Sequence, residues 1–209
     1  MRLTEFSYVQ ARLQARHGSS PNAATWQALE GSRTAAHYLA LARSGPLARW
    51  IDGLDEAGDA HRVERHLQAC WTRQVDAVAR WQPPRWQAAT HWFGTLTALP
   101  LSDAAQSAGQ AAARWLEQWH RLMPADAGDR GLLQQPAVLL LPRLSGSGAG
   151  RRASVEPERR ALLNLFRRHA ASAVAVFAYL ALSALDVERL RGGLVVRALF
   201  EPAPAANPT

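Results

Sequence analysis

Residues 60–82 read AHRVERHLQACWTRQVDAVARWQ, and this stretch decides the fold. Its apolar side chains recur every three or four residues, which places them on one face of an α-helix. These apolar positions are Val63, Leu67, Cys70, Trp71, Val75, Val78 and Trp81. Pro83 and Pro84 follow directly, and because neither can donate a backbone hydrogen bond, they end the predicted helix. The stretch therefore predicts a long amphipathic helix that packs against other helices.

The Pro-Pro break lies between two Arg-Trp pairs in residues 78–93, VARWQPPRWQAATHWF. One interpretation is structural: a corner between two helices, held together by Trp81 and Trp86. The other is functional, because tryptophan and arginine are over-represented among residues that contribute most to binding. Trp86 and Trp92 are six residues apart, so they cannot share one helix face. The candidate partner-binding residues are Arg80, Trp81, Arg85, Trp86 and Trp92.

Helical signals also dominate on either side of this stretch. Alanine and leucine are abundant, and proline and glycine fall between blocks. Upstream helices are predicted over residues 4–17, from a Ser20-Pro21 cap to Gly31, from a Ser32 cap to Ser44-Gly45, and from Pro46 onward. Downstream helices are predicted over residues 85–99 and after a Ser102-Asp103 cap, whereas residues 137–141, between Pro136 and Pro142, are either a buried extended piece or a helical turn. The predicted fold class is all-α, a compact multi-helix bundle with a long buried C-terminal helix.

That C-terminal helix is predicted to run from Pro157 to about Arg191 and to end at Gly192-Gly193. Its centre, residues 170–185, reads AASAVAVFAYLALSAL and has no charged side chain. A membrane-spanning helix needs ~20 predominantly apolar residues, and much of this run is alanine, so a buried central helix is favoured. The predicted organisation is a helical domain over residues 1–143, a flexible Gly/Ser/Arg linker over residues 144–156, the long helix packing back on the bundle over residues 157–200, and a disordered tail over residues 201–209.

Charge and cysteine content bear on partners and location. All 24 basic residues are arginine, as is typical of a GC-rich bacterial genome, and the formal net charge is +7 at pH 7. Acidic residues are interspersed among the arginines, which disfavours nucleic acid as a partner. The single cysteine, Cys70, lies in the apolar stripe and is predicted to be a core residue. The N-terminus lacks an apolar signal segment, so a cytoplasmic protein is expected, peripheral to the inner face of the membrane at most through a partner.

No residue pattern predicts catalysis, a cofactor or a metal site. The seven histidines include no pair at the three- or four-residue spacing that directs two rings toward one ion. The run GSGAG at residues 146–150 precedes a predicted helix but lacks the Gly-Lys-Ser/Thr ending of a phosphate-binding loop. No serine or threonine lies in a nucleophile-elbow context. We therefore expect a protein that is not an enzyme and that has no cofactor.

Several segments resemble a known family. Residues 8–16, YVQARLQAR, follow a Tyr-x-x-Ala-Arg-x-x-Ala-Arg type pattern. They are followed by YLALA at residues 38–42, PLARW at residues 46–50, VERHL at residues 63–67 and DVERLR at residues 186–191. This series resembles the C/d family of central-stalk connectors in V-type and A-type ATPases. The resemblance implies an all-helical, non-catalytic connector that seats the rotor axle on the membrane ring, with Arg/Trp surfaces as contact patches for another subunit.

The sequence thus predicts a non-catalytic helical interaction protein with protein partners. A connector-like component of a rotary ATPase, binding other rotary-ATPase subunits, is the function that the resemblance implies. Two alternatives stay open: a helical regulatory or adaptor module unrelated to ATPases, and an arginine-rich nucleic-acid-binding protein.

Overall fold

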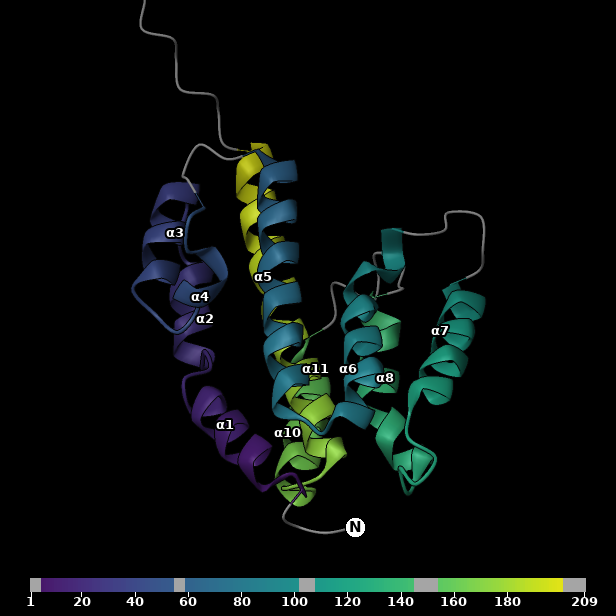
Figure 1. Ribbon diagram of the computed structural model, residues 1–209. Helices are drawn as coiled ribbons and strands as arrows, with labels where there is room; N and C mark the ends of the chain where they lie inside the picture. Colours follow the sequence, from purple (N-terminus) through teal and green to yellow (C-terminus); the bar gives the residue numbers. More distant parts are fainter. Residues whose placement is uncertain (1–4, 55–58, 102–107, 145–153, 201–209) are drawn as a thin grey trace, which may run out of the picture. The chain divides into compact units, whose positions relative to one another are not determined.

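The computed structural model describes residues 5–54, 59–101, 108–144 and 154–200, and every regular element in them is helical (Figure 1). The all-α prediction is therefore confirmed. The α-helices are α1 (Ser7–Gly18), α2 (Ala23–Glu30), α3 (Ala35–Arg43), α4 (Ala48–Ile51), α5 (Ala60–Trp81), α6 (Pro84–Gly94), α7 (Ala108–Leu122), α8 (Arg130–Leu144), α10 (Glu156–Arg168) and α11 (Ala173–Phe200). A 3-10 helix, η2 (Thr95–Leu101), follows α6.

The chain divides into two compact units, each made of segments that are distant in sequence. Unit 1 comprises Met1–Gly18 and Thr72–Leu185, and unit 2 comprises Ser19–Trp71 and Asp186–Thr209. The division falls inside α5 and inside α11, so each of these helices contributes residues to both units.

The predicted amphipathic helix is confirmed as α5, and the Pro-Pro break works as expected. Helix α5 ends at Trp81, and α6 begins at Pro84, where a proline is tolerated because the first helical turn needs no donor from it. The buried side chain of Gln82 crosses the break, and its Nε2 donates to Thr90 Oγ1 over 2.7 Å. Gly94 allows the end of α6 to approach α5, because a Cβ there would lie 2.9 Å from Val75 Cγ1.

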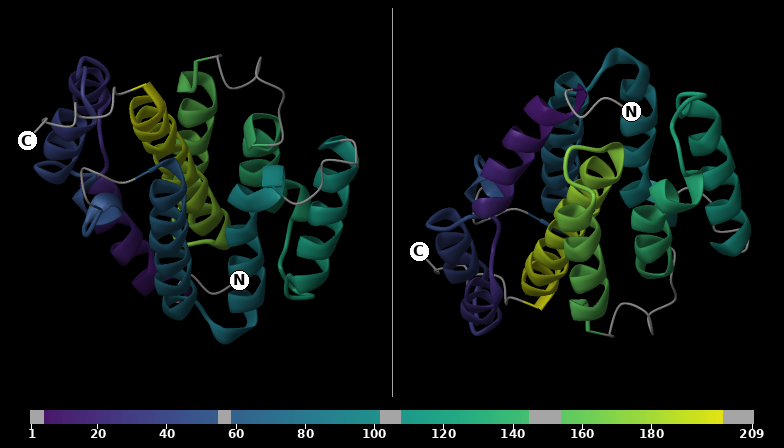
Figure 2. Two further views of the ribbon diagram at one scale, coloured as in Figure 1. Left: turned by 90° about the horizontal axis from the view of Figure 1, so that it is seen from above. Right: turned by 90° about the horizontal axis from the view of Figure 1, so that it is seen from below.

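The core of unit 1 is an aromatic cluster around the buried first half of α11. Helices α6, α7 and α8 with η2 are neighbours (Figures 1 and 2). Phe177 of α11 lies 4.8 Å from the ring centroid of Trp119 and 5.3 Å from that of Phe93. The indole nitrogen of Trp119 donates to the carbonyl of Ala89 over 2.8 Å, so this buried polar atom is satisfied. Aromatic pairs of this kind stabilise by about 0.5–1.5 kcal/mol beyond their area of burial.

In unit 2 the helices α2, α3 and α4 pack in sequence, and their caps differ from the prediction. Asn22 rather than Ser20 caps α2, and its Oδ1 accepts from the backbone of Thr25. Thr34 rather than Ser32 caps α3. Competing Ser, Asn and Thr residues lie within two positions of each other at these turns, so the sequence indicates a start but not which residue makes the cap.

The last part of α11 is fixed in unit 2 by Arg197. Its Nη2 donates to the carbonyl of Ser32 over 2.6 Å and to that of Leu29 over 3.3 Å, and its guanidinium carbon lies 4.4 Å from the ring centroid of Tyr38. One turn earlier in α11, Gly193 faces Tyr38. Two turns earlier, the guanidinium carbon of Arg189 lies 4.6 Å from the ring centroid of Trp26. The carbonyl of Leu29, near the end of α2, and that of Ser32 thereby accept hydrogen bonds from Arg197 of α11.

The prediction of a single long C-terminal helix is only partly correct. A long buried helix is present as α11, and residues 173–187 are all buried, as predicted for the uncharged run. However, α11 begins at Ala173 and not at Pro157, because the chain turns between α10 and α11 and Ala171 adopts a φ of 56°. Gly192-Gly193 does not end the helix, which continues to Phe200. Arg197 lies in the last turn of α11, and its hydrogen bonds to backbone carbonyls of unit 2 act against the roughly 1 kcal/mol helix penalty of each glycine.

The apolar run at residues 137–141 is part of a helix, which decides between the two alternatives. Helix α8 continues through both Pro136 and Pro142. Because proline has no N–H, the carbonyls of Leu132 and Val138 lack the donor that the residue four positions later normally provides.

Other predicted features lie outside the described residues, namely the Ser102-Asp103 cap, nearly all of the Gly/Ser/Arg linker and the tail over residues 201–209. Among the helices that the structure describes, none combines the length and the hydropathy needed to cross a bilayer.

Candidate functional site

Trp86, a predicted partner-binding residue, belongs to the core of unit 1. Its side chain is 1% exposed. Its ring centroid lies 5.9 Å from that of Phe6 and 6.1 Å from that of Phe177. Burial therefore removes Trp86 from the candidate surface, and the rings that it contacts come from the start of the chain and from α11, not from Trp81 across the corner.

Trp92 is half-buried and connects α6 to α7. Its ring stacks on that of Trp115, with 6.5 Å between centroids and an interplanar angle of 23°. Its indole nitrogen donates to the carbonyl of Trp115 over 3.1 Å, and the indole nitrogen of Trp115 donates to Thr95 Oγ1 over 2.9 Å. Both polar atoms of this pair are satisfied within the unit, so Trp92 has a structural role that accounts for its position.

Arg85 is exposed but already has two carboxylate partners. Its Nη2 lies 2.7 Å from Glu5 Oε2, and its Nη1 lies 2.7 Å from Asp126 Oδ2. The hydrogen bond to Glu5 is the main cause that raises the pKa of Arg85 above its ordinary value. A partner would have to displace these carboxylates in order to bind Arg85.

Trp81, unlike Trp86 and Trp92, contacts two arginines of α1, which lie over its ring. The guanidinium carbon of Arg16 lies 4.6 Å from the Trp81 ring centroid, and that of Arg12 lies 5.5 Å from it. Arg12 also lies 5.2 Å from the ring centroid of Tyr8, and its Nε donates to Tyr8 Oη over 3.0 Å. Arg16 Nη1 donates to Gln74 Oε1. We call the set Tyr8, Arg12, Arg16 and Trp81 the arginine–aromatic surface.

This surface carries positive charge that no acidic side chain of the described residues neutralises. Among the described residues, Arg12, Arg16 and the neighbouring exposed Arg80 form no ion pair with a carboxylate. A guanidinium group has five N–H donors, and the hydrogen bonds to Tyr8 and Gln74 use one each from Arg12 and Arg16. The remaining donors can therefore bind a carboxylate from outside the chain.

The positive potential extends along α1 to its end. His17 follows Arg16 and packs on Phe166, with ring centroids 5.0 Å apart. Burial lowers the pKa of His17, and the charges of Arg159 and Arg167 on α10 lower it further. The same field that disfavours the histidinium ion attracts anions to this part of unit 1.

Sequence reasoning found Trp81 and Arg80 but missed Tyr8, Arg12 and Arg16 as a surface. A signal was present, because their four-residue spacing places them on one helix face. The contacts of Arg12 and Arg16 with Trp81 join residues that are far apart in the sequence, and no local pattern indicates them. These three residues belong to the segment that carries the family resemblance.

Cys70 is a core residue of unit 2. Cys70 is 4% exposed, as predicted for a core residue, and its Sγ lies 3.4 Å from His66 Nε2. In the described part of the chain, no three His, Cys, Asp or Glu side chains come together as potential metal ligands.

The described part of the chain is all-helical, and its candidate site is the arginine–aromatic surface. Comparison of the chain with protein-family models, with curated proteins and with solved structures finds no match.

Proposed function

We propose that the protein is a non-catalytic helical interaction protein that binds an acidic segment of a partner protein on its arginine–aromatic surface. The observation that carries this proposal is the pair Arg12 and Arg16, held over Trp81 without a carboxylate partner among the described residues. Elsewhere in the described chain the arginines 85, 121, 143, 189 and 191 each pair with a carboxylate.

The chemistry of the surface fits a carboxylate-bearing partner. A guanidinium group can bind a carboxylate through two parallel hydrogen bonds, and stacking on Trp81 keeps it in position, so less side-chain freedom is lost on binding. Tyr8 is 56% exposed and adds an apolar face beside the charges. Tyrosine, tryptophan and arginine are the residue types whose loss most often weakens interfaces by about 2 kcal/mol or more.

A connector-like role in a rotary ATPase is one specific form of this proposal. The segment that resembles the C/d family of V-type and A-type ATPase connectors contains Tyr8, Arg12 and Arg16, so the residues behind the resemblance are also residues of the surface. This overlap supports a contact role for them, and the identity of the partner stays a prediction.

The test is affinity capture from extracts of the cells that make the protein, followed by identification of the captured proteins. The wild type is compared with the double variant Arg12→Gln, Arg16→Gln. Arg33→Gln is the matched control, because Arg33 is an exposed arginine of unit 2. We expect a protein with an acidic segment to bind the wild type and the control, and to be reduced about tenfold or more on the double variant. A melting curve for each variant checks that it is folded.

Binding of the captured protein is then measured with purified components in a salt series. Rotary-ATPase subunits among the partners would support the connector-like role. If the double variant captures the same proteins as the wild type, the arginine–aromatic surface is not the binding site. If nucleic acid binds with a steep salt dependence and no protein is captured, the nucleic-acid alternative replaces the proposal.

A further inference from the structure

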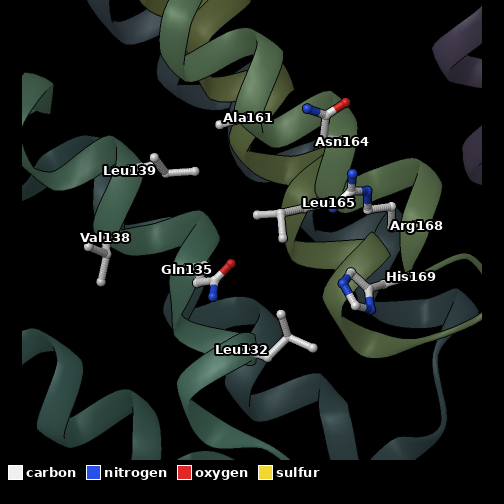
Figure 3. A pocket seen from close by; sticks show the side chains of 9 residues that line it. All are labelled: Leu132, Gln135, Val138, Leu139, Ala161, Asn164, Leu165, Arg168 and His169. Atoms are coloured by element: carbon white, nitrogen blue, oxygen red, sulfur yellow. The ribbon is translucent and has the colours of Figure 1, made fainter.

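A second surface of unit 1 is a groove between α8 and α10, distant in sequence from the arginine–aromatic surface. Its volume is about 530 Å³. Leu132, Val138 and Leu139 of α8 line one wall, and Leu165 of α10 projects from the other (Figure 3). The two helices are in contact, so the groove is formed by well-defined elements.

The groove exposes apolar side chains to solvent. None of its lining residues is buried, and Val138 is 45% exposed. Val138 is one of three large hydrophobic residues in the described chain that are strongly exposed. A molecule that covered these side chains would remove apolar surface from water, which favours binding.

The α10 wall of the groove carries a basic side chain, and the far end of the groove is apolar. Arg168 lies beside Leu165 and His169 lies near Leu132, whereas Leu139 and Ala161 lie at the opposite end (Figure 3). Arg160 and Arg167 of α10 are also exposed. Among the described residues, Arg168 forms no ion pair with a carboxylate. The groove therefore complements a ligand that is aliphatic along its length and carries an anionic group beside Arg168.

The openness of the groove indicates the class of ligand. Small-molecule sites usually bury roughly 70–90% of the surface of a drug-sized ligand. An open groove in which no lining residue is buried does not enclose a ligand to that extent. An amphipathic helix needs only one face covered, and its opposite face can stay in water.

We infer that the α8–α10 groove binds an amphipathic helix of a partner protein, with aliphatic side chains against Leu132, Val138 and Leu165 and carboxylates beside Arg168. This inference rests on the proposed function only in that both treat the chain as an interaction protein. It assigns a different surface and a different form of partner.

The test uses two synthetic peptides of about 15 residues, a length at which a helix can begin to form. Both carry leucines at helical i, i+3, i+4, i+7 spacing; one has glutamates on its polar face, and the other has glutamines there. Titration calorimetry measures the binding of each to the full chain. We expect saturable binding of the glutamate peptide and weaker binding of the glutamine peptide.

Two variants test the groove against matched controls. Val138→Asp places a carboxylate on the apolar wall and is expected to weaken the glutamate peptide about tenfold or more, whereas Val196→Asp, at a valine of α11 that is 54% exposed, should not. Arg168→Gln should reduce the preference for glutamate over glutamine about threefold or more, and Arg33→Gln should leave it unchanged.

No binding of the glutamate peptide to the wild type, or equal binding to Val138→Asp, would overturn the inference. The double variant Arg12→Gln, Arg16→Gln separates the two proposals. If it binds the glutamate peptide as the wild type does, the inference about the groove holds even if the proposal about the arginine–aromatic surface is wrong. If it abolishes peptide binding, the peptide binds at α1 and the groove assignment is wrong.

Discussion

At the scale of single residues, Gly193 shows how one absent side chain fixes a helix position. It lies inside α11, where glycine is unfavourable, but Tyr38 of α3 occupies the space in which its Cβ would lie. A Cβ at Gly193 would come 2.7 Å from Tyr38 Cζ and 3.0 Å from Cε2. The adjacent Gly192 has nothing within 4 Å of the same construction. Two neighbouring glycines in one helix therefore have opposite structural roles.

This contrast predicts opposite effects of the same substitution. Gly193→Ala should lower the free energy of unfolding by about 1–3 kcal/mol, because the Tyr38 ring must shift within a packed core. Gly192→Ala should raise it by about 0.5–1 kcal/mol, because alanine favours the helix and meets no neighbour. Urea denaturation of both variants measures the two changes. Equal effects would show that α3 and α11 do not pack as closely as described.

At the scale of elements, the sequence predicts those helices whose evidence is local. The stripe of α5 and the Pro-Pro break specify a helix and its end within one stretch, so α5 matches its prediction closely. Helix α8 differs, because Pro136 and Pro142 normally indicate helix ends. Gly192-Gly193 likewise predicts a helix end that the structure does not have. There, contacts of α11 with α3 and with the chain just after α2 outweigh the local preference of glycine. The ends of these helices depend on contacts with residues that are distant in sequence, and a local sequence pattern carries no information about such contacts.

The turn between α10 and α11 gives a second prediction. Ala171 adopts a φ of 56°, a left-handed conformation, and its backbone N–H donates to Gln10 Oε1 over 3.1 Å. Ala171→Gly should raise the free energy of unfolding by about 0.5 kcal/mol, since relief of about 1 kcal/mol of strain exceeds the added freedom of the unfolded chain. Ala170→Gly, one residue earlier and without a positive φ, should lower it by about 0.5 kcal/mol. Destabilisation by both variants would argue against the left-handed turn.

At the scale of the whole molecule, the sequence predicts the fold class better than the site. The abundance of arginine and tryptophan is visible in the sequence, but which of these residues pair with each other depends on folding. Trp86 is buried between Phe6 and Phe177, and Arg85 pairs with Glu5. All of these partners are far away in sequence. Of the predicted set, Trp81 therefore belongs to the arginine–aromatic surface, and the exposed Arg80 forms no ion pair with a carboxylate of the described residues.

The absence of lysine makes the alkaline stability of the whole chain unusually simple to interpret. Between pH 10 and 12 no lysine ammonium groups titrate. Burial raises the pKa of Tyr38 from its ordinary value of 10.0 to about 12. Since the folded pKa is above the unfolded one, the contribution of Tyr38 is fully present below pH 10 and is lost as the pH rises toward 12.

We therefore expect the free energy of unfolding to fall between pH 10 and 12, with on the order of 2–3 kcal/mol due to Tyr38. Denaturant unfolding at a series of pH values measures this slope. In Tyr38→Phe the slope over that interval should become correspondingly shallower. An unchanged slope in the variant would mean that the Tyr38 hydroxyl ionises as easily in the folded protein as in the unfolded chain.

The two prolines of α8 also bear on how its groove can accommodate a guest. Leu132 and Val138 line the groove, and their carbonyls are the two whose usual donors are replaced by Pro136 and Pro142. A helix that lacks two rungs of its hydrogen-bond ladder bends more easily than an intact one. We therefore expect the α8 wall of the groove to adjust its curvature to a bound helix, so that helices with side chains of different size can fit there.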